Sequence, residues 1–173
     1  MVIQNNMHFE ALYLMRDFVK KYLDPDKHLK ILEVGSFCTA PPEKNRIFRR
    51  YFNNNNWDFT GLDMAEGFNV DVVAQNPYKY PFEDESFDIV ISGNTLEHVE
   101  DTHRWIKELT RLTKNLVCII VPSSRPQHRY PVDCWRVFPD GMRFLLKDIA
   151  ELNILECRLC SGEDTIGIAT KLC

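Results

Sequence analysis

The stretch Leu29-Lys30-Ile31-Leu32-Glu33-Val34-Gly35 is a short apolar run that stops at a glycine, which is typical of a buried β-strand. After Pro41-Pro42 the spacing predicts a helix with apolar positions at Ile47, Phe48, Tyr51 and Phe52. The run Trp57–Leu62 then predicts a second strand that ends at Asp63. This order of strand, helix and strand is a β-α-β unit.

The rest of the chain continues to alternate strands with helices. The pattern predicts strands over residues 69–73, 87–92 and 116–121, and two C-terminal strands over 152–159 and 165–170. It predicts an N-terminal amphipathic helix over residues 11–23, a helix capped by Asp101 with Trp105, Leu109 and Leu112 facing inward, and a helix that begins at Pro139. We therefore expect an α/β fold, a doubly wound sheet with helices on both faces.

Composition excludes several classes of function. The chain has 173 residues, of which 45% are hydrophobic, and a formal net charge of -4. We therefore expect a single globular domain and no nucleic-acid partner, because no surplus of basic residues is present to neutralise phosphates. No apolar run reaches the ~20 residues that cross a bilayer, and the first residues do not resemble a signal peptide. These features predict a cytoplasmic protein that does not associate with a membrane.

The cysteine pattern gives no strong sign of disulfides or metal. Six cysteines are present in a chain large enough to fold without disulfides, so we expect reduced thiols. Cys157-Arg158-Leu159-Cys160 has the spacing of half a zinc site, but no second pair accompanies it. The sequence therefore predicts no metal site.

Doubly wound sheets bind ligands outside the carboxyl ends of their strands. This rule selects the loops that begin at Gly35, Asp63, Asn76, Gly93 and Pro122. Gly35 permits a sharp turn close to a ligand, and the carboxylate of Asp63 can accept hydrogen bonds from both hydroxyls of a ribose. The turn after Gly35 lacks the further glycines that seat a pyrophosphate, which disfavours a nicotinamide oxidoreductase.

Four segments together resemble one known family. They are Ile31–Gly35 (ILEVG), Thr60–Asp63 (TGLD), Pro81–Ser92 (PFEDESFDIVIS) and Leu96–Val99 (LEHV). In order and spacing they resemble class I S-adenosylmethionine (SAM)-dependent methyltransferases, in the group of small-molecule enzymes with PF-x-D-x-S-FD and LEH motifs. The resemblance implies a Rossmann-like, mostly parallel sheet with an antiparallel C-terminal strand. It divides the single domain 1–173 into an N-terminal helix (1–28), a cofactor-binding half (29–121) and a substrate loop with C-terminal strands (122–173).

The resemblance also implies SAM as cofactor, S-adenosylhomocysteine as product, and a set of cofactor-binding residues. Glu33 and Gly35 would lie beside the methionine part of SAM, and Asp63 would bind the ribose. Gln75 and Asn76 would contact the adenine in place of the usual Asp. The same loops add Ser36, Met64, Gly93 and Asn94 to the predicted cofactor site.

One departure from the family pattern concerns the glycine-rich first turn. The family usually has Glu-x-Gly-x-Gly-x-Gly, whereas this chain keeps Gly35 and has Phe37 and Thr39 at the next two glycine positions. This loss leaves open an alternative function, a SAM-binding or regulatory protein of the same fold without catalysis.

Candidate catalytic residues lie in two loops. Glu97 and His98 follow the strand 87–92, where Glu97 either faces the reacting end of the cofactor or caps the next helix. His128 and Asp133 lie in the loop that follows Pro122, where an imidazole oriented by a carboxylate could act as a base. We predict His128, Asp133 and His98 as catalytic residues.

The same loop is rich in groups that can bind a substrate. Tyr130 and Trp135 could stack on a ring, and Arg129 and Arg136 could bind an anionic group. The alternative is a rigid loop in which Arg136 pairs with Asp133.

The expected function is methyl transfer to a small polar acceptor, a hydroxyl of a sugar or related metabolite. The loop aromatics could equally mark a homodimer contact.

Overall fold

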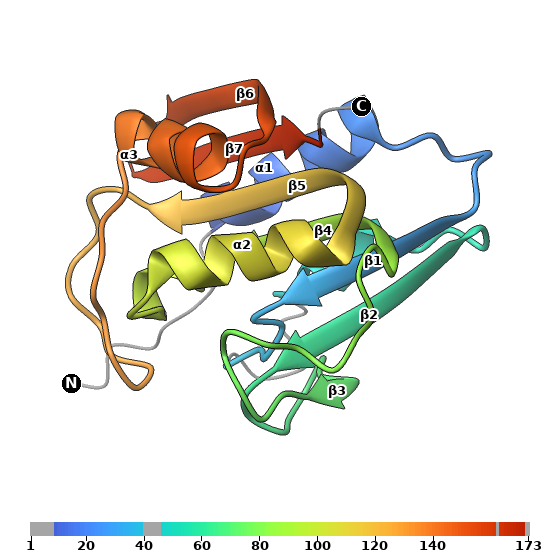
Figure 1. Cartoon of the computed structure of the whole chain (residues 1–173), viewed down its shortest axis with the longest axis horizontal. Helices are drawn as coiled ribbons and strands as arrows, with labels where there is room; N and C mark the ends of the chain where they lie inside the picture. The colour runs from blue at the N-terminus through green and yellow to red at the C-terminus, as the bar shows by residue number, and fades with distance from the viewer. Residues whose placement is uncertain (1–8, 40–45, 162, 172–173) are drawn as a thin grey trace.

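A seven-stranded sheet forms the centre of the molecule in the computed structural model, which describes residues 9–39, 46–161 and 163–171 (Figure 1). The strands stand in the order β3-β2-β1-β4-β5-β7-β6. Their bounds are β1 (Leu29–Val34), β2 (Trp57–Asp63), β3 (Val72–Val73), β4 (Phe87–Gly93), β5 (Thr113–Pro122), β6 (Asn153–Cys160) and β7 (Asp164–Thr170).

The strand directions confirm the predicted fold class. Neighbouring strands among β1 to β5 run parallel, whereas β7 runs antiparallel to both β5 and β6. From β1 the chain proceeds outward to β2 and β3, and from β4 it proceeds to β5 on the other side. The order therefore reverses between β1 and β4, where loops diverge and leave room for a ligand.

Helices cover both faces of the sheet. They are α1 (Phe9–Tyr22), η2 (Phe48–Tyr51), η3 (Leu96–His98), α2 (Thr102–Leu112), α3 (Pro139–Arg143) and the π-helix η4 (Phe144–Ile149). In Figure 1, α1 lies behind the sheet and α2 in front of it. Successive residues of a strand point to opposite faces, so Ile31 packs with α1 and η2 whereas Leu32 packs with α2 and η4.

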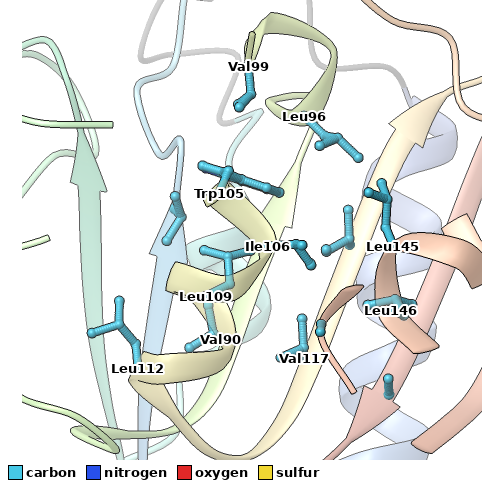
Figure 2. Packing of buried hydrophobic residues seen from close by; sticks show 14 of the residues in the cluster. Val90, Leu96, Val99, Trp105, Ile106, Leu109, Leu112, Val117, Leu145 and Leu146 are labelled. Atoms are coloured by element: carbon cyan, nitrogen blue, oxygen red, sulfur yellow. The ribbon is translucent and has the colours of Figure 1, made fainter. Parts of the chain in front are cut away.

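The core on the α2 face explains why this helix forms where it does. Asp101 caps it, because its carboxylate accepts a hydrogen bond from the backbone N–H of Arg104 at 3.0 Å. Trp105, Leu109 and Leu112 are each at most 1% exposed, and they pack toward the sheet and η4 (Figure 2). The predicted cap and inward face are therefore both confirmed.

The helix of the first crossover is shorter than predicted among the described residues. The sequence predicts a helix through Ile47–Phe52, but between β1 and β2 the described residues form only the four-residue 3₁₀ turn η2. This single turn already buries Phe48 and Phe52 against the sheet, so the packing requires no further helical turn. Pro41 and Pro42, where the helix was expected to begin, lie outside the described residues.

The third strand is also shorter than predicted, because two of its residues are used elsewhere. The sequence predicts a strand over residues 69–73, but β3 contains only Val72 and Val73. Asn69 has a positive φ of 75°, and the Asp71 carboxylate accepts hydrogen bonds from the backbone N–H of Gly61 and from Arg49. These contacts take the place of the first hydrogen bonds that a longer β3 would make with β2.

Two further findings concern the remaining predictions. The five cysteines that the structure describes are all free thiols, as expected. No helix in the described ranges has the length and apolar character that a membrane span requires.

Candidate functional site

A pocket of about 730 Å³ opens at the carboxyl ends of the parallel strands. The loops that follow β1, β2, β3, β4 and β5 all contribute to its lining, and Trp105 of α2 closes one side. The loops selected from the sequence therefore surround one cavity, which has the size expected for a small-molecule site.

The turn after β1 depends on Gly35. This residue has a positive φ of 79°, and a Cβ there would overlap the side chain of Thr95. The backbone N–H groups of Gly35 and Ser36 both donate to the carbonyl of Leu62, at 2.9 and 3.0 Å. The turn is thereby held against the end of β2.

Other side chains hold this turn where the family pattern has glycines. The N–H of Phe37 donates to the Asp63 carboxylate at 2.9 Å, and the Phe37 ring lies against Gly67. The side-chain amide of Asn69 donates to the carbonyl of Ser36 and to the carboxyl group of Glu33, both at 2.9 Å. Hydrogen bonds made by the side chains of Asp63 and Asn69 therefore fix the conformation of this turn.

Two side chains on the pocket wall keep free capacity to accept hydrogen bonds. Each oxygen of Asp63 accepts one backbone N–H, from Phe37 and from Ala65, which leaves lone pairs available on the carboxylate. The buried Oδ1 of Asn94 has no hydrogen-bond partner within the described structure. Both residues line the pocket, so a bound ligand with hydroxyl or ammonium donors would satisfy them.

Glu33 lies behind the pocket wall, with a side chain that is almost fully buried. Burial raises the pKa of Glu33 to about 8, although the hydrogen bond from Asn69 and the charge of Arg49 lower it. The folded chain therefore holds a neutral carboxylic acid at this position at neutral pH.

The loop between β5 and α3 is attached to η3, which follows β4 and also lines the pocket. The backbone carbonyl of Glu97 accepts the N–H of Cys134 at 2.7 Å, and the carbonyl of Val99 accepts the indole N–H of Trp135 at 2.7 Å. His98 Nδ1 lies 2.6 Å from the carbonyl of Val132. These bonds bring the loop, and His128 with it, over η3.

Glu97, His98 and His128 meet in this corner, and we name them the Glu97–His98–His128 cluster. Glu97 Oε1 lies 3.7 Å from His98 Nε2 and 3.8 Å from His128 Nε2. The two imidazole rings pack edge to face with centroids 4.9 Å apart. The facing carboxylate of Glu97 raises the pKa of His128 above its ordinary value, against the effect of burial. All three residues line the pocket.

Known proteins match this chain in both sequence and fold. The family model described as "Methyltransferase domain" matches residues 45–120. Solved structures of SAM-dependent methyltransferases from Aquifex aeolicus and Methanosarcina mazei share the fold, with TM-scores of 0.63 and 0.62. Residues 45–120 therefore match a methyltransferase domain, and the chain has the fold that these SAM-dependent methyltransferases share.

The coverage of these matches differs between structures and sequence relatives. The Aquifex aeolicus structure is 16% identical, and the match covers 91% of this chain and 89% of that structure's chain. The Methanosarcina mazei structure is 17% identical, and the match covers 90% of this chain and 97% of that structure's chain. A curated relative, norajmaline N-methyltransferase from Rauvolfia serpentina, is 30% identical over 112 residues. That match covers 65% of this chain but only 36% of the relative. The matched domain and the SAM-dependent structures imply SAM as cofactor.

The structure places many of the predicted site residues on the pocket wall. The predicted residues that line the pocket are Gly35, Asp63, Met64, Gly93, Asn94, His98, His128, Arg129 and Tyr130. Among the described residues, those that do not line it are Glu33, Ser36, Gln75, Asn76, Asp133, Trp135 and Arg136. In the loop after β3, the residues that line the pocket are Pro77, Tyr78 and Tyr80, whereas Gln75 and Asn76 were expected to do so.

Asp133 does not orient the imidazole of His128 as the sequence suggested. Its carboxylate accepts the backbone N–H of His128 at 2.6 Å, whereas its distance to His128 Nδ1 is 3.8 Å. Arg136 donates to both oxygens of Asp133, and these bonds lower the pKa of Asp133 to about 2. Arg136 also donates to the carbonyls of Arg125 and Pro126. The alternative interpretation, a loop braced by this ion pair, is the one that the structure supports.

The sequence did not identify Glu97 as the carboxylate that faces both histidines, nor the aromatic wall of Tyr78 and Trp105. The LEH motif gave a signal for Glu97, but the helix-cap interpretation was equally consistent with it. Tyr78 and Trp105 carried no signal apart from their hydrophobicity, which also fits a core.

Replacing Asp63 tests the cofactor end of the pocket. We expect Asp63→Ala to weaken SAM binding at least about tenfold, since it removes charged hydrogen bonds worth ~1.5–3 kcal/mol. Asp58→Ala, at the exposed start of the same strand, is the matched control and should bind SAM like the wild type. Isothermal titration calorimetry measures both. Equal affinity of wild type and Asp63→Ala would contradict the assignment.

Replacing Glu33 tests its buried neutral state. A folded-state pKa of about 8, above the ordinary 4.5, means that its stabilising contribution is complete below pH 4.5 and is lost as pH rises toward 8. Glu33→Gln keeps the shape and the acceptor for Asn69 but cannot ionise. We expect this variant to gain at least about 1 kcal/mol of stability relative to wild type between pH 5 and pH 8. Urea denaturation across this range measures it, and a pH-independent difference would contradict the prediction.

Proposed function

We propose that this methyltransferase transfers the methyl group of SAM to a hydroxyl of a small polar acceptor, such as a sugar or a related metabolite. The observation that carries the proposal is that one pocket is lined both by free acceptors for a cofactor and by the Glu97–His98–His128 cluster. An oxygen nucleophile requires proton removal, which this cluster is equipped to perform.

The cofactor end of the pocket suits SAM. The unpaired Oδ1 of Asn94 can accept from an ammonium group, and the free lone pairs of Asp63 can accept from ribose hydroxyls. Gly35 keeps side-chain atoms away from the cofactor at the turn. When bound, SAM supplies an electrophilic methyl group and leaves as S-adenosylhomocysteine, which keeps the electron pair of the broken sulfur–carbon bond.

The acceptor end supplies positioning and a base. The acceptor oxygen gives its proton to His128 Nε2 and forms the new bond to the methyl carbon. Asp133, paired with Arg136, accepts the backbone N–H of His128 and so fixes the backbone that carries the imidazole. When the acceptor oxygen and the methyl group are held in the reacting geometry, a bimolecular step becomes effectively unimolecular.

The lining of this end favours a compact acceptor with polar groups. Tyr130 is 46% exposed, lies edge-on to His98 and offers a ring face, and Arg129 stands beside it on the pocket wall. The name of the curated relative assigns it a nitrogen acceptor. We favour oxygen here because an alcohol needs the base that the cluster provides, whereas a neutral amine already carries a nucleophilic lone pair.

The test is to measure S-adenosylhomocysteine formation over pairs of acceptors that differ only in a hydroxyl or an amine, sugars and amino sugars first. We expect turnover with hydroxyl acceptors. Turnover with amines alone would contradict the proposed acceptor class. SAM binding without product over the whole panel would favour the non-catalytic alternative.

A further inference from the structure

The carboxylate of Glu97 lacks the partners that a buried charge requires. Its side chain is 1% exposed, and neither Oε1 nor Oε2 has a hydrogen-bond partner in the described structure. Among the described residues its ion-pair partners are only His98 and His128, at 3.7 and 3.8 Å. These distances are too long for hydrogen bonds. A buried carboxylate without bonds is costly, so a positive group between these three side chains would stabilise them.

Both imidazoles present a lone pair to this carboxylate. His98 Nδ1 lies 2.6 Å from the carbonyl of Val132, and His128 Nδ1 lies 3.2 Å from the carbonyl of Pro126. A carbonyl can only accept, so each Nδ1 carries the hydrogen and each neutral ring has its lone pair on Nε2. Metal-binding histidines commonly have this arrangement, with one ring nitrogen on a carbonyl and the other on the ion.

We propose that the Glu97–His98–His128 cluster binds one divalent transition-metal ion through Glu97 and the Nε2 atoms of His98 and His128. The ligand atoms of the three side chains lie within 4.8 Å of one another. Two ligands at the usual ~2.0–2.1 Å from one ion are roughly 3.3 Å apart in a tetrahedral site. The two distances from Glu97 to the imidazoles would therefore shorten by about half an ångström, and the widest separation in the cluster by at most about 1.5 Å.

The donor set indicates the kind of ion and its use. Two imidazoles and one carboxylate suit Zn²⁺ or Co²⁺ better than Mg²⁺, which prefers oxygen ligands. Three protein ligands that face a pocket leave an open position, as catalytic sites do. Given the proposed function, the acceptor oxygen would occupy that position. With the ion bound, His128 Nε2 is a ligand and cannot also take the proton, so the ion replaces it in activating the acceptor. The ion lowers the pKa of the hydroxyl, whose proton passes to solvent, and the oxygen then forms its bond to the methyl carbon as the sulfur–carbon bond breaks.

The test is calorimetric titration of the EDTA-treated, dialysed protein with Zn²⁺, repeated with Co²⁺ while its visible absorption is recorded. We expect one ion per chain with micromolar or tighter affinity, and at least about tenfold weaker binding for His98→Ala, His128→Ala and Glu97→Gln. Mg²⁺ at the same concentration should not displace Co²⁺. The matched control is His103→Ala, an exposed histidine on α2 whose loss should leave metal binding unchanged.

Two results would overturn the metal site: no binding by the wild type, or equal binding by the wild type and the folded variants. Circular dichroism identifies any variant that fails to fold, and Glu97→Gln, which keeps the size of the side chain, then serves alone. Titration of the same EDTA-treated sample with SAM separates the two proposals. SAM binding without metal binding leaves the proposed function standing, whereas absence of SAM binding defeats that function whatever the metal result.

Discussion

His128→Ala is expected to lower kcat by about 10²–10⁴, with the acceptor that gives the highest turnover, and to leave SAM affinity nearly unchanged. The reason is geometric. His128 lies beside Glu97 on the loop after β5, whereas Asp63 and Asn94, the residues proposed to bind SAM, lie at the end of β2 and in the loop after β4. Removal of the imidazole takes away the group that activates the acceptor oxygen but no residue assigned to SAM.

The control for this prediction is His103→Ala, which removes an imidazole of equal size outside the pocket and should keep full turnover. Steady-state kinetics with SAM and acceptor varied separately give kcat and both KM values. A His128→Ala variant with wild-type turnover would show that His128 has no part in the reaction. A loss confined to SAM binding would move His128 to the cofactor side.

Trp105→Ala is expected to lower the free energy of unfolding by about 3–5 kcal/mol. Trp105 is 1% exposed, packs among the buried residues drawn in Figure 2, and also lines the pocket. Its indole N–H donates to the hydroxyl of Tyr80 at 3.0 Å, and both groups are buried. The substitution therefore opens a cavity and removes a hydrogen bond at the same position. Urea denaturation gives the difference directly.

Trp105→Phe is the matched variant, since it keeps an aromatic ring and removes only the donor and part of the volume. We expect it to lose clearly less stability than Trp105→Ala, on the order of 1–2 kcal/mol. If Trp105→Ala cost less than about 1 kcal/mol, as surface substitutions do, the packing of α2 described above would be wrong.

Most strands and the cap of α2 were predicted well because their signals are local. The run Leu29–Val34 has the observed bounds of β1, and Asp101 is the observed cap of α2. The length of the first crossover was not predictable in this way. Apolar residues three and four positions apart, such as Phe48 and Phe52, fit one 3₁₀ turn as well as a longer α-helix, and only packing against the sheet decides between them.

The site was predicted in part, and the reason lies in what sequence spacing can determine. The fold rule located the five loops, because parallel strands bring their carboxyl ends to one edge whatever the side chains are. Which side chains face each other across that edge depends on loop conformation. The Asp133 carboxylate pairs with the nearby Arg136, and this local bond displaces it from the imidazole of His128. Glu97 takes that place although it lies 31 positions before His128.

The most direct test of the account is calorimetric titration of the wild-type protein with SAM and S-adenosylhomocysteine, with NAD as the negative control. The account predicts one binding site per chain with micromolar affinity for both SAM and its product, and no heat of binding with NAD. Absence of SAM binding by the folded protein, or equal binding of NAD, would contradict the claim that this pocket is a methyltransferase cofactor site.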